Sequence, residues 1–381
     1  MKKTKRPLNT WAFLGIYLAI LAVFAGVYAL TKAINTPVPI VGTGSYTPGT
    51  YTGVGAGRNG DITVEVTVNE NTIQAIQIVR HDETPGISDG AIADIPAAIV
   101  ATQSLGVDSV SGATVSSEGI VAAVADAIAK AGGDVEALKN VAIAAGEHSS
   151  KELTADVVVV GGGGAGMTAA VRLAEQGKHV ILFEKASFLG GAISVSGGNQ
   201  VIMGSKLQAE NGVTDDSVES MVADFQANGA NKNNEEILTL FAENVGSATD
   251  WLVEHCGVGF AEGLHQLGEY THNRELAYTG GGAGFAETMR KAVADSGAEV
   301  YLSTKVESLI TDDNGAVVGV KAVSTDGNTD YTVSAANVIL ATGGYGNNKE
   351  MLTDEMKSAL YYGPATSTGE GIQMAQAVGA Q

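Results

Sequence analysis

A run of hydroxyl side chains around residue 114 is placed where it could hold a phosphate group. Residues 108–117 read DSVSGATVSS, and apolar residues at helical spacing, among them Ile120 and Ile128, follow directly. The first N–H groups of a helix have no partner within the helix, and its dipole attracts anions. The hydroxyls of Thr114 and Ser116 would therefore lie beside a favourable phosphate position. The alternative is that one of these hydroxyls only caps the helix.

A glycine-rich run further along the chain has the pattern of a nucleotide site. The apolar residues 157–160 lead into GGGGAGMTAAVRLAEQG at 161–177, and a second strand-like run, residues 179–183, ends at Glu184. This order of strand, glycine turn, helix, strand and acidic residue is typical of a Rossmann-like dinucleotide-binding unit. The alternative, a glycine-rich loop without a ligand, leaves the acidic residue at this distance unexplained.

The residues of this unit are expected to have separate tasks. Gly161 turns the chain, Gly163 lets the backbone approach a pyrophosphate, and Gly166 lets the helix pack on the strand. Glu184 is placed to accept both hydroxyls of an adenosine ribose. The residues predicted to lie against a cofactor are Gly161, Gly163, Gly164, Ala165, Gly166 and Glu184.

The elements that position these residues form two domains of α/β class. Alternating apolar residues at 62–68 and a second run at 73–79 predict a β-hairpin, and helices are expected to begin near Ala91 and after Ser116. A small α+β domain followed by a Rossmann-like domain accounts for this order. The expected divisions are a linker at 35–50, the small domain at 45–132, a connector at 133–152 and the nucleotide-binding domain at 153–381.

The first domain resembles the FMN-binding domains of sodium-pumping quinone reductase subunits, electron-transport accessory proteins and exported flavin reductases. The resemblance rests on residues 108–117, on GTYTGVG at 49–55 and on HDETPG at 81–86. In that family an exported flavin transferase joins the phosphate of FMN to the threonine of SGAT by a phosphoester bond. The resemblance thus implies covalent FMN on Thr114.

The second domain resembles the flavin-dependent fumarate reductase and succinate dehydrogenase superfamily. The resemblance rests on KASFLGGAISVSGG at 185–198 and NVILATGGYGNN at 337–348. It implies that the dinucleotide is non-covalent FAD, with Val306 at the adenine and Glu370 near the flavin. The further FAD contacts that it implies are Lys185, Gly190, Gly191, Ala192, Gly197, Gly198, Ala341, Thr342, Gly343 and Gly344.

The combination of domains resembles the exported reductases of α,β-unsaturated carboxylates, of the flavocytochrome c fumarate reductase and urocanate reductase family. That resemblance implies electron flow from FMN to FAD and then to a small unsaturated acid, with a quinone-linked membrane donor or a flavoprotein donor. The family's catalytic histidine, arginines and capping domain would follow Gln381, so we expect a C-terminally truncated reductase and assign no catalytic residue. Two alternatives are a flavin electron carrier without reductase activity and another FAD-dependent dehydrogenase on the same fold.

The N-terminus predicts export. Lys2, Lys3, Lys5 and Arg6 precede an apolar run at 11–30, about the 20 residues that a helix needs to cross a bilayer. The positive-inside rule then keeps the basic end in the cytoplasm. We expect residues 1–34 to form a single-pass anchor in the cell membrane, with the flavin domains on the extracytoplasmic side. A cleaved signal peptide is the alternative.

Composition excludes several other functions. Asp and Glu outnumber Lys and Arg by 42 to 22, which gives a net charge of −20 and argues against a nucleic-acid partner. The single cysteine, Cys256, cannot form an internal disulfide or hold a Cys-ligated iron–sulfur cluster alone. The spacing of His255, His265 and His272 is irregular, so no metal site is predicted.

Overall fold

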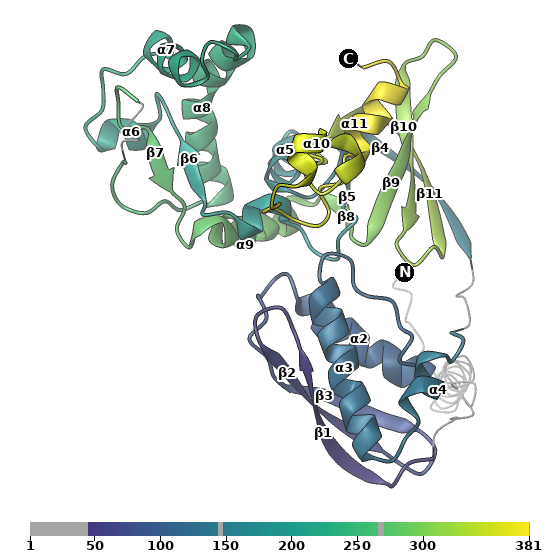
Figure 1. The fold of residues 1–381 in the computed structure, drawn as a ribbon. Helices are drawn as coiled ribbons and strands as arrows, with labels where there is room; N and C mark the ends of the chain where they lie inside the picture. The colour runs from purple at the N-terminus through teal and green to yellow at the C-terminus, as the bar shows by residue number, and fades with distance from the viewer. Residues whose placement is uncertain (1–44, 144–147, 266–269, 381) are drawn as a thin grey trace, which may run out of the picture.

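The computed structural model describes residues 45–143, 148–265 and 270–380. Figure 1 shows three lobes: an N-terminal domain, a second domain built on a larger sheet, and a helical lobe beside that sheet. The predicted membrane anchor at residues 1–34, with the first part of the predicted linker, lies outside the described residues. Within the described ranges, no helix is both long and apolar enough to cross a membrane.

The N-terminal domain is a three-stranded antiparallel sheet with helices packed on one face (Figure 1). Its core contains Ile62, Val64 and Val66 from alternate positions of the middle strand. The predicted hairpin is confirmed, because the second and third strands pair antiparallel. The elements are β1 (Gly49–Ala56), β2 (Asp61–Val68), β3 (Ile73–Arg80), α2 (Asp89–Thr102), α3 (Thr114–Lys130) and α4 (Val135–Lys139).

Strand β1 crosses helix α3 in direct backbone contact. A Cβ on Gly53 would lie 1.9 Å from the carbonyl oxygen of Ala123, and one on Gly55 would lie 2.2 Å from that of Gly119. No side chain fits at these distances, so the glycines of GTYTGVG allow the strand and the helix to pack closely.

Two predicted connecting segments contain ordered elements. The predicted linker at 35–50 includes the start of β1, and Tyr46 is buried in the core of the N-terminal domain. The predicted connector at 133–152 holds α4, whose Leu138 is buried in the same core. It also holds the start of the next strand, which is polar because its first residues pair with a neighbouring strand outside the apolar core.

The second domain is built on a six-stranded sheet of order β8-β5-β4-β11-β10-β9. The first four strands are parallel, and β11, β10 and β9 form an antiparallel meander. The elements of this domain are β4 (Ser149–Val160), α5 (Gly164–Glu175), β5 (Val180–Phe183), α9 (Gly281–Ser296), β8 (Glu299–Tyr301), β9 (Thr304–Thr311), β10 (Val317–Ser324), β11 (Thr329–Leu340) and α11 (Glu370–Ala377).

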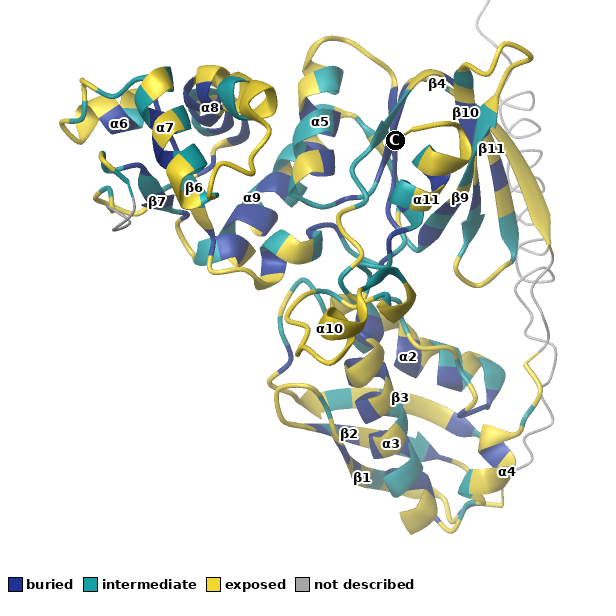
Figure 2. Ribbon diagram, turned by 45° about the horizontal axis from the view of Figure 1, so that its top comes forward, coloured by how far each residue is buried: buried dark blue, intermediate teal, exposed yellow. Residues whose placement is uncertain are grey.

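The last four residues of strand β4 are all valine and all buried, because both faces of the sheet are covered there. Val157 and Val159 pack in a cluster with residues of α5 and α9. Val158 and Val160 pack on the other side, with residues of the meander and Met374 of α11. This two-sided burial, visible in Figure 2, is typical of parallel strands.

The helical lobe lies away from the N-terminal domain in both ribbon views. In it, the fully buried Arg274 forms ion pairs with the carboxylates of Asp216 and Asp224, at 2.6 and 2.5 Å.

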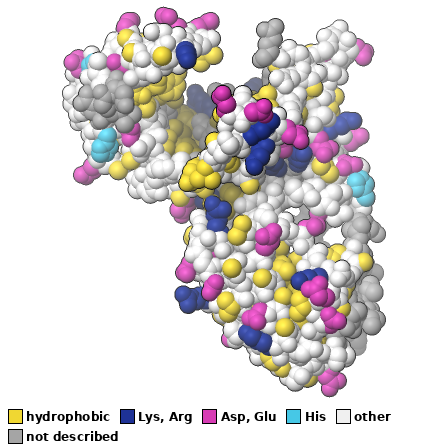
Figure 3. Space-filling model, viewed as in Figure 1, with side chains coloured by type: hydrophobic (Ala, Val, Ile, Leu, Met, Phe, Trp, Pro, Cys, Tyr) yellow, Lys and Arg dark blue, Asp and Glu magenta, His cyan; other side chains and the backbone are white. Residues whose placement is uncertain are grey.

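Acidic side chains are spread over the face of the molecule seen in Figure 3. The remaining elements of the chain are η1 (Gly191–Val195), β6 (Asn199–Val201), α6 (Lys206–Glu210), α7 (Val218–Asn228), α8 (Glu235–Cys256), β7 (Glu275–Ala277), η2 (Lys349–Met351) and α10 (Asp354–Lys357).

Candidate cofactor site

A cavity of about 1110 Å³ opens at the carboxyl ends of strands β4 and β11. Strand β4 is followed in the sheet by β5 and β8 on one side and by β11 on the other. The chain thus leaves β4 toward one side and later returns to its other side. In open α/β sheets this switch in direction creates the crevice in which ligands bind. Val160 and Gly161 line the cavity from β4, and Leu340 and Ala341 line it from β11.

The glycine turn after β4 has the geometry that a bound pyrophosphate requires. Gly161 has a φ of +102°, and a Cβ on it would lie 2.5 Å from the carbonyl oxygen of Ala341. A Cβ on Gly166 would lie 1.8 Å from the carbonyl oxygen of Gly161, so the helix can approach the strand only without a side chain there. Gly163 is the N-cap residue of α5 and has no side chain to cap the helix, and the nearest atom to a Cβ on it would be 4.0 Å away. The helix N-terminus therefore faces open space, where its N–H groups and dipole favour an anion.

Glu184 directly follows strand β5 and is a buried carboxylate at one end of the cavity. Its side chain accepts hydrogen bonds from the N–H groups of Gly162 and Ala186, at 2.6 and 2.7 Å. Burial raises the pKa of Glu184, and these backbone hydrogen bonds offset part of the increase. Each carboxylate oxygen has more than one acceptor position, so both can still accept ribose hydroxyls.

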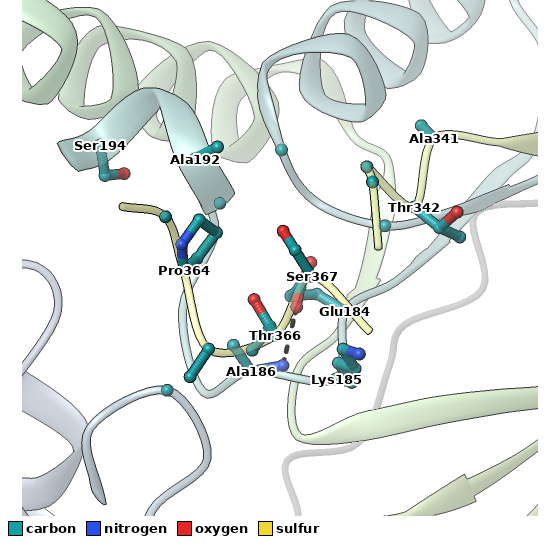
Figure 4. Close-up of a pocket in the computed structure, with 18 of the residues that line it drawn as sticks. Glu184, Lys185, Ala186, Ala192, Ser194, Ala341, Thr342, Pro364, Thr366 and Ser367 are labelled. Carbon is teal, nitrogen blue, oxygen red and sulfur yellow. Dashed lines mark hydrogen bonds between the residues drawn. The ribbon is translucent and has the colours of Figure 1, made fainter. Parts of the chain in front are cut away.

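Ser194 lies at the other end of the cavity. Figure 4 shows Ser194 and Ala192 on one side and Glu184 with Lys185 on the other. The Oγ of Ser194 is buried and has no hydrogen-bond partner among the described residues. A buried hydroxyl without a partner costs free energy, so this atom fits a polar group of a bound cofactor. Together with Glu184 and the α5 N-terminus, it fits an elongated dinucleotide such as FAD.

Most residues predicted from the sequence line this one cavity. From β9, Val306 reaches it as a buried side chain. The predicted residues in the cavity wall are Gly161, Gly163, Gly164, Ala165, Glu184, Lys185, Gly191, Ala192, Val306, Ala341, Thr342, Gly343, Gly344 and Glu370.

Four predicted glycines, Gly166, Gly190, Gly197 and Gly198, lie outside the cavity wall. A Cβ on Gly198 would lie 2.1 Å from the amide nitrogen of Gly282, so Gly198 packs against the start of α9. Gly190 donates its N–H to the carbonyl of Gly162 at 2.8 Å and stabilises the glycine turn. Gly166 and Gly198 thus allow neighbouring backbones to pack closely, whereas a Cβ on Gly197 would contact no atom within 4 Å.

Glu370 lines the cavity beside Lys185, the residue that follows Glu184. It accepts hydrogen bonds from Lys185 at 3.0 Å and from Thr368 at 2.6 Å, and Lys305 lies 4.0 Å away. Burial would raise the pKa of Glu370, but the hydrogen bonds from Thr368 and Lys185 outweigh it and lower the pKa. The ionised carboxylate of Glu370 therefore lies in the part of the cavity that contains Glu184 and Val306. Its two lysine partners are the sequence neighbours of these residues, Lys185 and Lys305.

The N-terminus of helix α3 is free of side-chain caps. The helix begins at Thr114 after Ala113, and no side chain accepts a cap hydrogen bond. The alternative in which Thr114 or Ser116 caps the helix is therefore wrong. Thr114 is exposed, whereas Ser116 is buried and donates to the carboxylate of Glu83.

Several residues of the cavity wall were not predicted. The segment 361–367 crosses the site, and Figure 4 shows its Pro364, Thr366 and Ser367 between the two ends. This segment belongs to none of the motifs assigned to the site from the sequence. The N-terminal domain also lines the cavity, which only the packing of the two domains reveals. The wall residues from that domain are Arg58, Glu83, Thr84, Ile87, Ser88, Gly112 and Ser116.

Two of the histidines that could suggest a metal site lie next to carboxylates, and the cysteine is buried. His255 lies 2.5 Å from the carboxylate of Glu175, and His272 lies 3.4 Å from that of Asp216. Burial raises the pKa of the Cys256 thiol to about 11, so the thiol is protonated at neutral pH. Among the described residues, no group of three or more His, Cys, Asp or Glu side chains is arranged to hold a metal ion.

Two family models match separate parts of the chain. The FMN-binding domain family matches residues 57–129, and the FAD binding domain family matches residues 156–381. A solved structure, the open conformation of a flavocytochrome c3 fumarate reductase, has a TM-score of 0.56 and 34% sequence identity. That alignment covers 60% of this chain and 41% of the other.

Two curated relatives align with both domains. The urocanate reductase of Eggerthella lenta is 34% identical over 337 residues, which cover 87% of this chain and 55% of the relative. The NADH:acrylate oxidoreductase of Vibrio harveyi is 30% identical over 406 residues, covering 88% of this chain and 40% of the relative. The chain spans about half the length of these relatives. With its FMN-binding domain and the match over residues 156–381, the chain belongs to the FAD binding domain family.

Proposed function

We propose that this chain carries the two flavin sites of an oxidoreductase that reduces an α,β-unsaturated carboxylate. The observation that supports the proposal is the single cavity that both domains line. The similar urocanate reductase, NADH:acrylate oxidoreductase and fumarate reductase are named for small unsaturated acids. The combination of an FMN-binding and an FAD-binding domain therefore favours a small unsaturated acid as the substrate.

The described residues would hold and orient the cofactors. The α5 N-terminus would bind the pyrophosphate of FAD, Glu184 its ribose, and Ser194 a polar group at the other end. FMN would be joined to Thr114 through its phosphate by a flavin transferase. When bound, FAD would supply hydride to a carbon–carbon double bond, with its electrons supplied through FMN by a quinone-linked or flavoprotein donor.

A second function, a flavin electron carrier that reduces no substrate, is favoured by the composition of the cavity wall. Among the described residues of that wall there is no histidine, and its arginine, Arg58, is exposed. Reduction of an unsaturated acid requires a proton donor and a clamp on the carboxylate, both aligned with the reacting bond.

The two functions are separated by assaying a pair of proteins. One is this chain, and the other is this chain extended by the C-terminal half of the urocanate reductase relative, each made with a flavin transferase and supplied with FAD. We expect urocanate, fumarate or acrylate to oxidise a reduced dye donor only with the extended protein. If all three acids leave the donor reduced although both flavins are bound, the reductase proposal is contradicted and the carrier is favoured.

We also propose a membrane location, with the flavin domains on the extracytoplasmic side. The support is the basic end and the apolar run at 11–30. Protease added to intact cells whose outer barrier has been opened should digest the flavin domains, while a cytoplasmic control protein stays intact. Complete protection of the flavin domains would contradict this orientation.

A further inference from the structure

The two domains meet beside the cavity at the loop between β5 and η1. The N–H of Ser187 in this loop donates to the carbonyl oxygen of Ser111 at 3.2 Å, and its hydroxyl donates to the same oxygen at 3.3 Å. Ser111 is the serine of SGAT, three residues before Thr114. The contact therefore positions the start of helix α3 next to the FAD-binding loop.

Three glycines of the N-terminal domain face side chains of the second domain. A Cβ on Gly112 would lie 2.8 Å from the ring of Phe188, and one on Gly90 would lie 3.0 Å from the hydroxyl of Ser187. A Cβ on Gly86, in the HDETPG turn, would lie 2.7 Å from the guanidinium of Arg290. The N-terminal domain thus has no side chains at the three positions where side chains of the second domain approach its backbone.

Arg290 connects this contact to the cofactor loop. Its guanidinium donates to the carbonyl oxygen of Leu189 at 2.9 Å, while the same group faces Gly86. Phe188 lines the cavity together with Gly112. The segment 186–189 therefore contacts the N-terminal domain on one side and borders the candidate FAD site on the other.

We propose that residues 186–189 and Arg290 form a docking surface for the FMN-binding domain of the same chain. Docking places Gly112 and Ser116, on either side of Thr114 in sequence, in the wall of the cavity that the FAD loop lines, and it closes this side of the cavity to water. The role in electron transfer rests on the proposed function. The docking itself needs no flavin, so its failure can be distinguished from failure of that function.

A disulfide tests the docking directly. An ideal Cβ on Gly90 would lie 3.3 Å from the Cβ of Ser187, close to the lower limit of about 3.5 Å seen in disulfides. The native Cys256 is buried and is not expected to compete. Under mild oxidation, the double variant Gly90→Cys/Ser187→Cys should form an intrachain disulfide, seen as a shifted monomer band on a non-reducing gel. The rate should be the same with and without FAD.

The matched control pairs Gly90→Cys with Ser247→Cys, an exposed serine on α8, which both ribbon views place away from α2. We expect the Ser187 pair to cross-link at least about tenfold faster than this control, because docking raises the local concentration of its thiols. Adding Phe188→Ala should slow the reaction by about fivefold, the effect of losing a modest packing contact. Equal rates for the two pairs, or a disulfide-linked dimer in place of the shifted monomer, would overturn the proposal.

Hydrogen exchange gives a second test that requires no substitution. The amide of Ser187 donates to Ser111 across the domain boundary, so it should exchange at least about tenfold more slowly than in an unfolded chain. Exchange of this amide at the unfolded rate would overturn the docking proposal even if the cysteine variants failed to fold.

Discussion

Thr114→Ala should abolish covalent attachment of FMN in protein made together with a flavin transferase. Thr114 is the exposed hydroxyl at the first turn of α3. The hydroxyl of Ser116 is bonded to Glu83, and that of Ser117 is buried and donates to the carbonyl of Ala113 at 3.0 Å. Neither can replace Thr114 without breaking its own hydrogen bond, so we expect the loss to be complete. The measurement is flavin fluorescence of the chain on a denaturing gel.

The matched control for this prediction is Thr52→Ala, which removes an exposed threonine from strand β1 of the same domain. It should leave the fluorescent band unchanged. A band of undiminished intensity in Thr114→Ala would show that another residue carries the flavin.

Glu184→Ala should weaken FAD binding by about 30-fold to 1,000-fold, corresponding to about 2–4 kcal/mol. The substitution removes the acceptor for two ribose hydroxyls. It also leaves the buried N–H groups of Gly162 and Ala186 without their carboxylate partner. Each buried group left unpaired costs about 1–3 kcal/mol. Titration of the FAD-free chain with FAD, followed by flavin fluorescence, measures the change in dissociation constant.

The control for this second prediction is Glu307→Ala, an exposed carboxylate next to Val306 on strand β9. It removes the same charge near the cavity, and we expect little change in FAD affinity. Covalent FMN should be unaffected in both variants. Unchanged FAD affinity in Glu184→Ala would mean that the ribose does not bind at this carboxylate.

The nucleotide-binding unit could be predicted because its geometry leaves few alternatives. Gly166 lies so close to the backbone of Gly161 that a side chain is impossible. The end of strand β4, residues 157–160, is covered on both faces, so this part of its sequence is uniformly apolar. Such constraints act between residues that are close in sequence, so they appear in the sequence as a glycine-rich motif after an apolar run. Glu184 could be predicted for a similar reason, since it directly follows β5, the strand that pairs with the end of β4.

Other parts of the site depend on contacts between distant segments, which no local pattern predicts. Gly198 belongs to a motif expected at the flavin, but its positive φ and its contact with Gly282 give it a packing role. Glu370 is placed by Lys185, nearly two hundred residues earlier in the chain. The contribution of the N-terminal domain to the cavity, through residues such as Glu83, follows from the docking of two separately predicted domains.

The measurement that tests the central claim most directly is the flavin content of the purified chain after denaturation. The protein, made with a flavin transferase and saturated with FAD, is freed of unbound flavin and precipitated with acid. We predict about one equivalent of FAD in the supernatant and about one equivalent of FMN in the pellet, on a peptide that contains Thr114, as expected for one site of each kind. Release of all the flavin into the supernatant, or only one kind of flavin per chain, would contradict the account.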